Sequence, residues 1–255
     1  MKEKKQLGKV TVTKTEKVFY YTTLFTFLIS IVYVVYRIIY TAKYGGDEVT
    51  DKVMADYLLM LLQLVAGAII IHIPSFVERR IRIEVPSFMN ILFIIFLFCA
   101  IYLGEVQFFY YKIAFWDTIL HFFSAVMLGC LSFSVINALS ANKIEGIHPL
   151  FVMIFAFCFA ITIEVIWEFY EFCWDFFAGF NMQKYQTEEG INLIGQAALI
   201  DTMEDLFVGA VGAFLASLAG FFSIKKNTGF VRKMILTKQK TENTENTDEN
   251  IDAKN

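Results

Sequence analysis

The feature that most constrains this chain is a series of unbroken apolar runs, each about 20 residues long. At 1.5 Å per residue, a helix of that length crosses the ~30 Å hydrocarbon core of a bilayer. The runs do not alternate apolar with polar residues, as the strands of a membrane β-barrel do, and they are longer than such strands. Hydrophobic residues make up 57% of the sequence and charged residues only 18%, whereas soluble domains carry about 25% charge. The sequence therefore predicts an all-α, polytopic membrane helix bundle.

Six runs are expected to span the membrane, with the three prolines at or near their ends, as suits helix termini. The runs are Val18–Tyr40, Tyr57–Ile73, Ser87–Tyr110, Phe115–Leu139, Pro149–Phe177 and Ile200–Ile224. Residues 18–224 are thus expected to form one membrane domain, with an acidic site within 115–224. Residues 1–17 are expected to form a basic cytoplasmic tail, and 225–255 a cytoplasmic tail that is largely disordered because it is polar and of low complexity.

The distribution of Lys and Arg predicts the orientation of the bundle. Seventeen of the 22 basic residues fall in the N-terminal tail, the loops after the second and fourth runs, and the C-terminal tail. Because basic residues accumulate on the cytoplasmic side, we expect both termini in the cytoplasm and an even number of spans. No basic patch with interleaved aromatics lies outside the runs, so nucleic acid is not an expected partner, whereas membrane lipids are.

Ionisable residues enter the last three runs at helical spacing. The fourth run begins with Asp117 and His121, four residues apart and therefore on one helix face. The fifth and sixth runs carry further acids at offsets that keep each set on one face, namely Glu164, Glu168, Glu171, Asp175, Asp201, Glu204 and Asp205. In the predicted orientation, all three sets lie toward the outer ends of their helices. The stripes continue into Ala and Gly at spacing four, which predicts a tight contact among the three helices.

A cluster of carboxylates inside a membrane is costly unless it is protonated, paired with a cation or bound to metal. Histidine with several carboxylates is a ligand set for Zn²⁺, Mn²⁺ or Fe, so Asp117, His121, Asp201 and Asp205 are candidate metal ligands. Glu168, with Glu164, is the candidate catalytic group, since a carboxylate can act as a general base. Candidate substrate-binding residues are Arg37, Glu171 and Asp175. The alternative is a set of polar helix ends in a water-exposed vestibule.

The residues of these three runs carry a family resemblance. Three motifs resemble those of the YjdF-like bacterial inner-membrane proteins. They are Trp116-Asp117-x-x-Leu120-His121-Phe122, then Glu164-x-x-x-Glu168 with Asp175, then Asp201-Thr202-x-x-Asp205. More distantly, the pattern is similar to VanZ-like proteins, although these tend to carry Gln where this chain has Glu168. The resemblance covers about residues 115–220. It implies a bacterial plasma membrane setting, and the VanZ-like likeness implies a link to the cell envelope, but neither implies a reaction.

Three functions remain open from the sequence. The first is a metal-dependent enzyme acting on a lipid or lipid-linked envelope substrate. The second is a cation or proton transporter, since acids within a membrane commonly mark such routes. The residues below Glu164 are apolar, however, which disfavours a continuous polar path. The third is a non-catalytic envelope scaffold whose acids lock the helices together.

Overall fold

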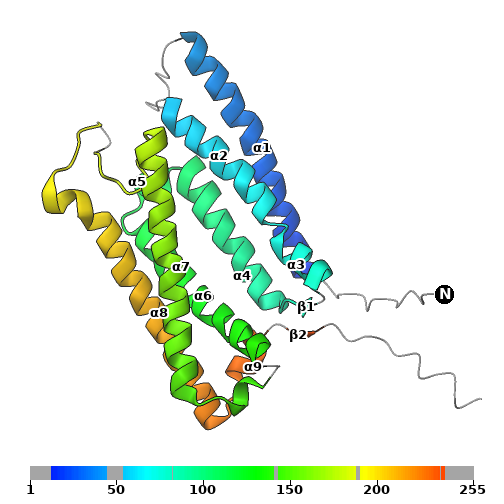
Figure 1. Ribbon diagram of the computed structural model, residues 1–255. Helices are drawn as coiled ribbons and strands as arrows, with labels where there is room; N and C mark the ends of the chain where they lie inside the picture. The colour runs from blue at the N-terminus through cyan, green and yellow to red at the C-terminus, as the bar shows by residue number, and fades with distance from the viewer. Residues whose placement is uncertain are drawn as a thin grey trace, which may run out of the picture.

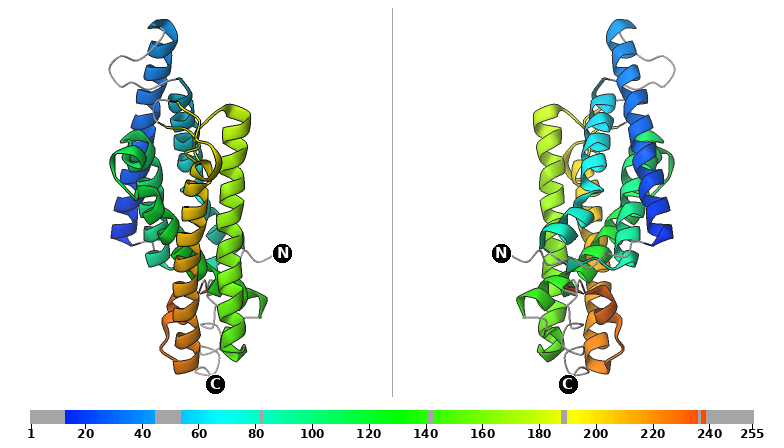
Figure 2. Two further views of the ribbon diagram at one scale, coloured as in Figure 1. Left: turned by 90° about the vertical axis from the view of Figure 1, so that its left-hand side faces the viewer. Right: turned by 90° about the vertical axis from the view of Figure 1, so that its right-hand side faces the viewer.

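The protein is an all-helical bundle in which six helices are long and apolar enough to cross a membrane (Figure 1). The structure, a computed structural model, describes residues 13–44, 54–81, 83–140, 143–187, 190–235 and 237–238. The expectations for residues 1–12, and for most of the C-terminal tail, lie outside these described residues. The views in Figure 2 show the long helices side by side along one axis.

The first three spans form one half of the bundle. Helix α1 (Lys14–Tyr44) packs on α2 (Met54–Ile70) and on α4 (Ser87–Leu97), which continues as the π-helix η1 (Phe98–Val106). A short turn after α2 leads into α3 (Ile73–Ile81). The fully buried side chains of Phe27, Leu64 and Ile94 represent the apolar core that joins these helices.

The last three spans form the other half. Their helices are α6 (Trp116–Leu139), α7 (Pro149–Ala178) and α8 (Ile200–Lys226). Shorter elements connect and follow them: α5 (Phe109–Lys112), η2 (Ile144–Gly146), η3 (Gly195–Leu199) and α9 (Phe230–Met234). The predicted third run was too long at its C-terminal end, because the helix stops at Val106 and Phe108 takes a positive φ of 67°.

The ends of the spans confirm that an even number of crossings separates the loop after α3 from the C-terminal segment. Strand β1 (Ile83–Glu84) pairs antiparallel with β2 (Thr237–Lys238), which follows the last span. At the same end, Arg232 forms an ion pair with Glu145 in the loop after α6. Three segments that the sequence assigns to one side of the membrane therefore lie together. That this side is cytoplasmic stays a prediction.

Small residues bring α6, α7 and α8 together, as the spacing of Ala and Gly predicts. Ala125, Ala160 and Ala213, one from each helix, are fully buried against each other. A Cβ added to Gly212 would lie 2.7 Å from the backbone oxygen of Phe122. Because backbone atoms cannot move aside cheaply, only glycine fits here. This contact fixes the relative positions of the polar helix ends above it.

We expect Gly212→Ala to destabilise the bundle by about 1–3 kcal/mol, since the added methyl group overpacks the contact between α6 and α8. Thermal unfolding in detergent measures the effect. Gly146→Ala is the matched control, because nothing lies within 4 Å of a Cβ at that position. Equal stability of the Gly212→Ala variant and the unmodified protein would contradict the close approach.

Candidate metal centre

The candidate site begins with His121, which projects from the first turns of α6 and is buried. Its Nδ1 lies 3.0 Å from Oε2 of Glu164 on α7. In the neutral tautomer in which Nδ1 carries the proton and donates to Glu164, the lone pair of Nε2 is free to bind a metal. The other oxygen of Glu164 accepts a 2.7 Å hydrogen bond from the Ser124 hydroxyl. Glu164 is therefore fully engaged in holding the imidazole.

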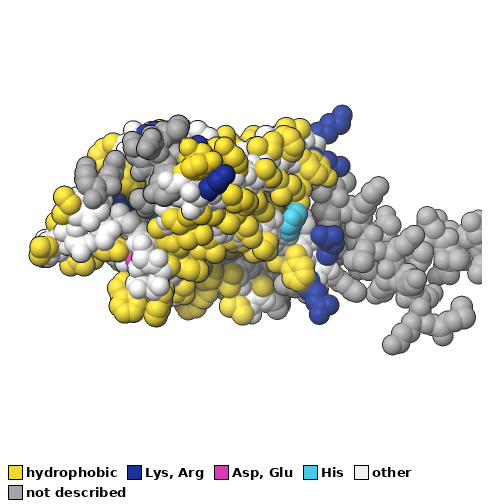
Figure 3. Space-filling view, turned by 90° about the horizontal axis from the view of Figure 1, so that it is seen from above, with side chains coloured by type: hydrophobic (Ala, Val, Ile, Leu, Met, Phe, Trp, Pro, Cys, Tyr) yellow, Lys and Arg dark blue, Asp and Glu magenta, His cyan; other side chains and the backbone are white. Residues whose placement is uncertain are grey.

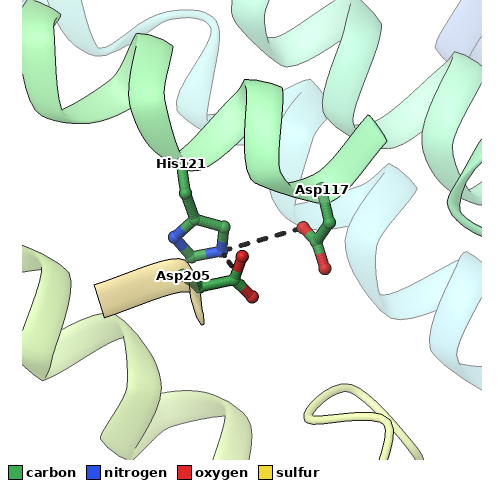
Figure 4. Close-up of side chains that lie close together, drawn as sticks. All are labelled: Asp117, His121 and Asp205. Atoms are coloured by element: carbon green, nitrogen blue, oxygen red, sulfur yellow. Dashed lines mark ion pairs between the residues drawn. The ribbon is translucent and has the colours of Figure 1, made fainter. Parts of the chain in front are cut away.

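Two carboxylates approach the free nitrogen of His121 (Figure 4). Oδ1 of Asp117, one turn earlier on α6, lies 3.7 Å from Nε2. Oδ2 of Asp205, from α8, also lies 3.7 Å from Nε2. One ligand atom from each of the three residues falls within 4.8 Å of the other two. Two helices thus direct one nitrogen and two oxygens toward a common point, and His121 and Asp205 are buried.

A segment that follows α7 returns over this cluster and brings a lysine with it. The Lys184 Nζ donates hydrogen bonds to Asp117 Oδ2 at 2.5 Å and to Asp201 Oδ1 at 2.8 Å. Burial opposes the charge on Lys184, but the two carboxylates raise its pKa above the ordinary lysine value. Lys184 is therefore an ammonium ion at neutral pH. Asp201, a candidate metal ligand from sequence, is thus paired with a lysine and lies outside the three-residue cluster.

The remaining candidate residues hold the returning segment or line the site. Asp175 accepts hydrogen bonds from the backbone N–H groups of Met182 and Gln183, at 2.7 and 2.9 Å. Glu171 accepts a 2.8 Å hydrogen bond from Trp167. The contacts of Asp175 give it a positioning role, so its predicted role in substrate binding has no direct support here. Arg37 lies in the other half of the bundle, over the rings of Tyr40 and Tyr57.

Glu168 is a candidate residue with only one of its two oxygens hydrogen-bonded among the described residues. Its Oε2 accepts a 3.2 Å hydrogen bond from the Gln183 side chain, which also donates to Thr202 at 2.9 Å. Its Oε1 is buried and has no partner among the described residues, and the same holds for Oδ2 of Asp201 and Nε1 of Trp116. Buried polar atoms without partners are rare in folded proteins. Three of them belong to residues at the same end of the bundle.

Sequence reasoning missed Gln183, Lys184 and Tyr110. The first two belong to an irregular connection, where no periodicity reveals which side chain turns inward. Tyr110 follows η1, and burial together with the charges of Asp117 and Glu105 raises its pKa well above the ordinary value. Its hydroxyl therefore stays protonated near the acids. The sequence did contain one indication that Lys184 lies at the site. It is a basic residue in the connection between the fifth and sixth runs, both of which place acids at the same end of the bundle.

The face of the molecule seen from above is mainly hydrophobic, and little acidic surface is visible among the coloured atoms (Figure 3). The segment after α7 crosses this end of the bundle in Figure 1 and so contributes to this cover. The cluster is therefore a sheltered centre, and the vestibule of fully hydrated helix ends does not fit the burial of His121, Glu164 and Asp205.

Asp175→Asn should loosen the segment over the site, because an amide keeps the size of the side chain but removes one of the two acceptors for Met182 and Gln183. A hydrogen bond to a charged group contributes about 1.5–3 kcal/mol, so amide hydrogen exchange in residues 180–187 should accelerate at least about tenfold. Glu145→Gln, at the opposite end, is the control. Unchanged exchange at Met182 and Gln183 would show that Asp175 does not hold the segment.

Comparison with known proteins places the chain in a family without assigning a reaction. An uncharacterized protein of Thermotoga maritima is 25% identical over 143 residues, which cover 55% of this chain and 66% of that protein. No solved structure matches the chain. The family model described as "Predicted membrane protein (DUF2238)" matches residues 23–226, a range that includes almost all of the six spans and every candidate site residue. This multi-pass membrane protein therefore belongs to the DUF2238 family, with which the YjdF-like resemblance agrees.

Proposed function

We propose that this protein is a membrane-embedded, metal-dependent enzyme that acts on a lipid or lipid-linked substrate of the cell envelope. The observation that carries the proposal is the convergence of Asp117, His121 and Asp205 on one point. Ligands about 2.0–2.2 Å from a tetrahedral Zn²⁺ lie roughly 3.3 Å apart. The two 3.7 Å distances from His121 Nε2 therefore need only a small adjustment around Zn²⁺, Mn²⁺ or Fe²⁺.

The charges around the centre also favour a bound cation. Beside the Asp117, Asp205 and Glu164 carboxylates stand three more, on Asp201, Glu168 and Glu171, all at the same end of the bundle. Lys184 is the one described Lys or Arg that pairs with them in the structure. Uncompensated buried charges cost several kcal/mol each. A divalent ion at His121 would supply the missing positive charge where the carboxylates are closest.

The residues divide naturally into roles. His121 Nε2, Asp117 and Asp205 would hold the metal, while Glu164 fixes the orientation and the tautomer of the imidazole. The metal, when bound, supplies Lewis acidity and lowers the pKa of a bound water. Glu168, whose Oε1 has no partner among the described residues, would be the general base of the site. Glu164, with both oxygens engaged, acts as a positioning residue.

The surroundings of the site favour a substrate from the membrane itself. Helices α7 and α8 present large exposed apolar side chains at the level of the acids, among them Trp167, Phe169, Phe172, Met203 and Phe207. In a bilayer these surfaces contact acyl chains. A lipid could thus bring its polar head to the site without leaving the membrane. The resemblance to YjdF-like and VanZ-like proteins supports a bacterial plasma membrane and a cell-envelope setting.

Transport is the weaker alternative. Directly below the site, Ala125, Ala160 and Ala213 close the contact between the three helices, and all three are fully buried. A cation or proton would need polar groups or water continuing inward from the acids. The packing offers an apolar layer there, so the site fits chemistry at one membrane surface better than passage across the bilayer.

The purified protein should contain one divalent transition metal per chain. His121→Ala and Asp205→Asn should each lose most of it, because each removes one of three protein ligands. Metal content by mass spectrometry, in protein purified in mild detergent, tests this. His148→Ala removes a histidine in the loop at the opposite end and is the matched control. A folded protein that stays metal-free after incubation with Zn²⁺, Mn²⁺ and Fe²⁺ would exclude the proposal.

Glu168→Gln should keep the metal and lose activity about 10²–10⁴-fold, the usual contribution of a general base. Turnover is measured on a panel of phospholipids and polyprenyl phosphates, with metal content determined on the same sample. Glu204→Gln, an acid one residue before Asp205 that is exposed, is the control. Full activity of Glu168→Gln would remove Glu168 from catalysis, and metal or proton flux in liposomes without turnover would favour transport.

A further inference from the structure

The segment after α7 places the Lys184 ammonium between the carboxylates of Asp117 and Asp201. Asp117 has its Oδ1 toward His121 Nε2 and its Oδ2 on the Lys184 ammonium. This carboxylate therefore bridges two positions, one at the proposed metal centre and one at Lys184. Carboxylates bridge the ions of two-metal sites in the same way, with the ions about 3.5–4 Å apart.

The surroundings of the Lys184 ammonium have the chemistry of a cation site. Asp201 Oδ1 is its second partner at 2.8 Å, and Asp201 Oδ2 is buried without a partner among the described residues. Next to Lys184 in sequence, Gln183 donates a hydrogen bond to one oxygen of Glu168. The Glu168 side chain is only 4% exposed, and its other oxygen has no partner in the described part of the chain. Carboxylate oxygens thus remain available beyond those that the ammonium uses.

Lys184 is held in this position by several independent contacts. The two N–H groups before it are bound by Asp175, and Gln183 is anchored to Glu168 and Thr202. Lys184 itself has a positive φ of 47°, a conformation that a residue with a side chain adopts only when its surroundings impose it. The fold therefore specifies the place of this lysine, so the ammonium is a built-in part of the site.

We propose that the Lys184 ammonium takes the place of a second metal ion between Asp117 and Asp201 and thereby limits the site to one divalent ion. This inference rests on the proposed metal centre at His121. Its consequence is that the enzyme works with a single metal and a fixed ammonium beside it. The reaction would then use one metal-bound water, and the ammonium would supply a second positive charge for an anionic group of the substrate.

Metal stoichiometry tests the inference without an activity assay. The unmodified protein is stripped of metal and titrated with Mn²⁺. Binding is measured by calorimetry and by metal analysis after desalting, and it should saturate at one ion per chain. Lys184→Met and Lys184→Gln should each bind two, because removal of the ammonium leaves Asp117 and Asp201 to a second ion. Lys112→Met is the matched control, since Lys112 is at the same end but donates only to the backbone oxygen of Gln107; it should bind one.

The outcomes separate this inference from the function on which it rests. Two ions in the unmodified protein would overturn the inference and leave the metal centre standing. A second contrary result is one ion in the unmodified protein and one in a Lys184 variant that thermal unfolding shows to be folded. This result would also overturn the inference and leave the metal centre standing. No ion in the unmodified protein would overturn the metal centre and the inference together. Loss of folding in one Lys184 variant leaves the other variant and the unmodified protein to decide.

Discussion

The structure depends on how a membrane protein compensates a group of buried carboxylates. Moving ionised carboxylates from water into the bundle costs several kcal/mol each. Hydrogen bonds from Ser124, Trp167 and Gln183, together with the ammonium of Lys184, stabilise these carboxylates. Among the described residues, one oxygen of Glu168 and one of Asp201 have no partner. The proposed metal at His121 supplies the charge that the protein itself does not provide.

The polar centre is precise because the packing below it is tight. Gly129 and Gly212 allow α6 and α8 to approach until a Cβ at either position would meet atoms within 3.0 Å. A Cβ added to Gly209 would lie 3.3 Å from the side chain of Glu164. Small residues thus serve two purposes: they join the three helices and they set the distances between the acids on those helices. The first three spans have a separate apolar core and contribute no side chain to the three-residue cluster.

The sequence was sufficient where a regular period determines the structure. The apolar runs predicted all six spans, and the spacing of Asp117, His121, Glu164 and Asp205 predicted their convergence at one end of the bundle. The sequence could not distinguish Asp201 from Asp205, because both lie on the same face of α8 and only the position of Lys184 separates their roles. Nor could it place residues 179–187, since the path of an irregular segment depends on contacts such as those of Asp175.

The location of a bound ion is the most direct test of the metal centre. We would determine an experimental structure of the protein after incubation with Zn²⁺ or Mn²⁺ and locate the ion by its anomalous scattering. The account predicts a single peak about 2.0–2.2 Å from His121 Nε2 and from one oxygen each of Asp117 and Asp205. A structure with this cluster intact and no peak there, or with the ion bound elsewhere, would contradict it.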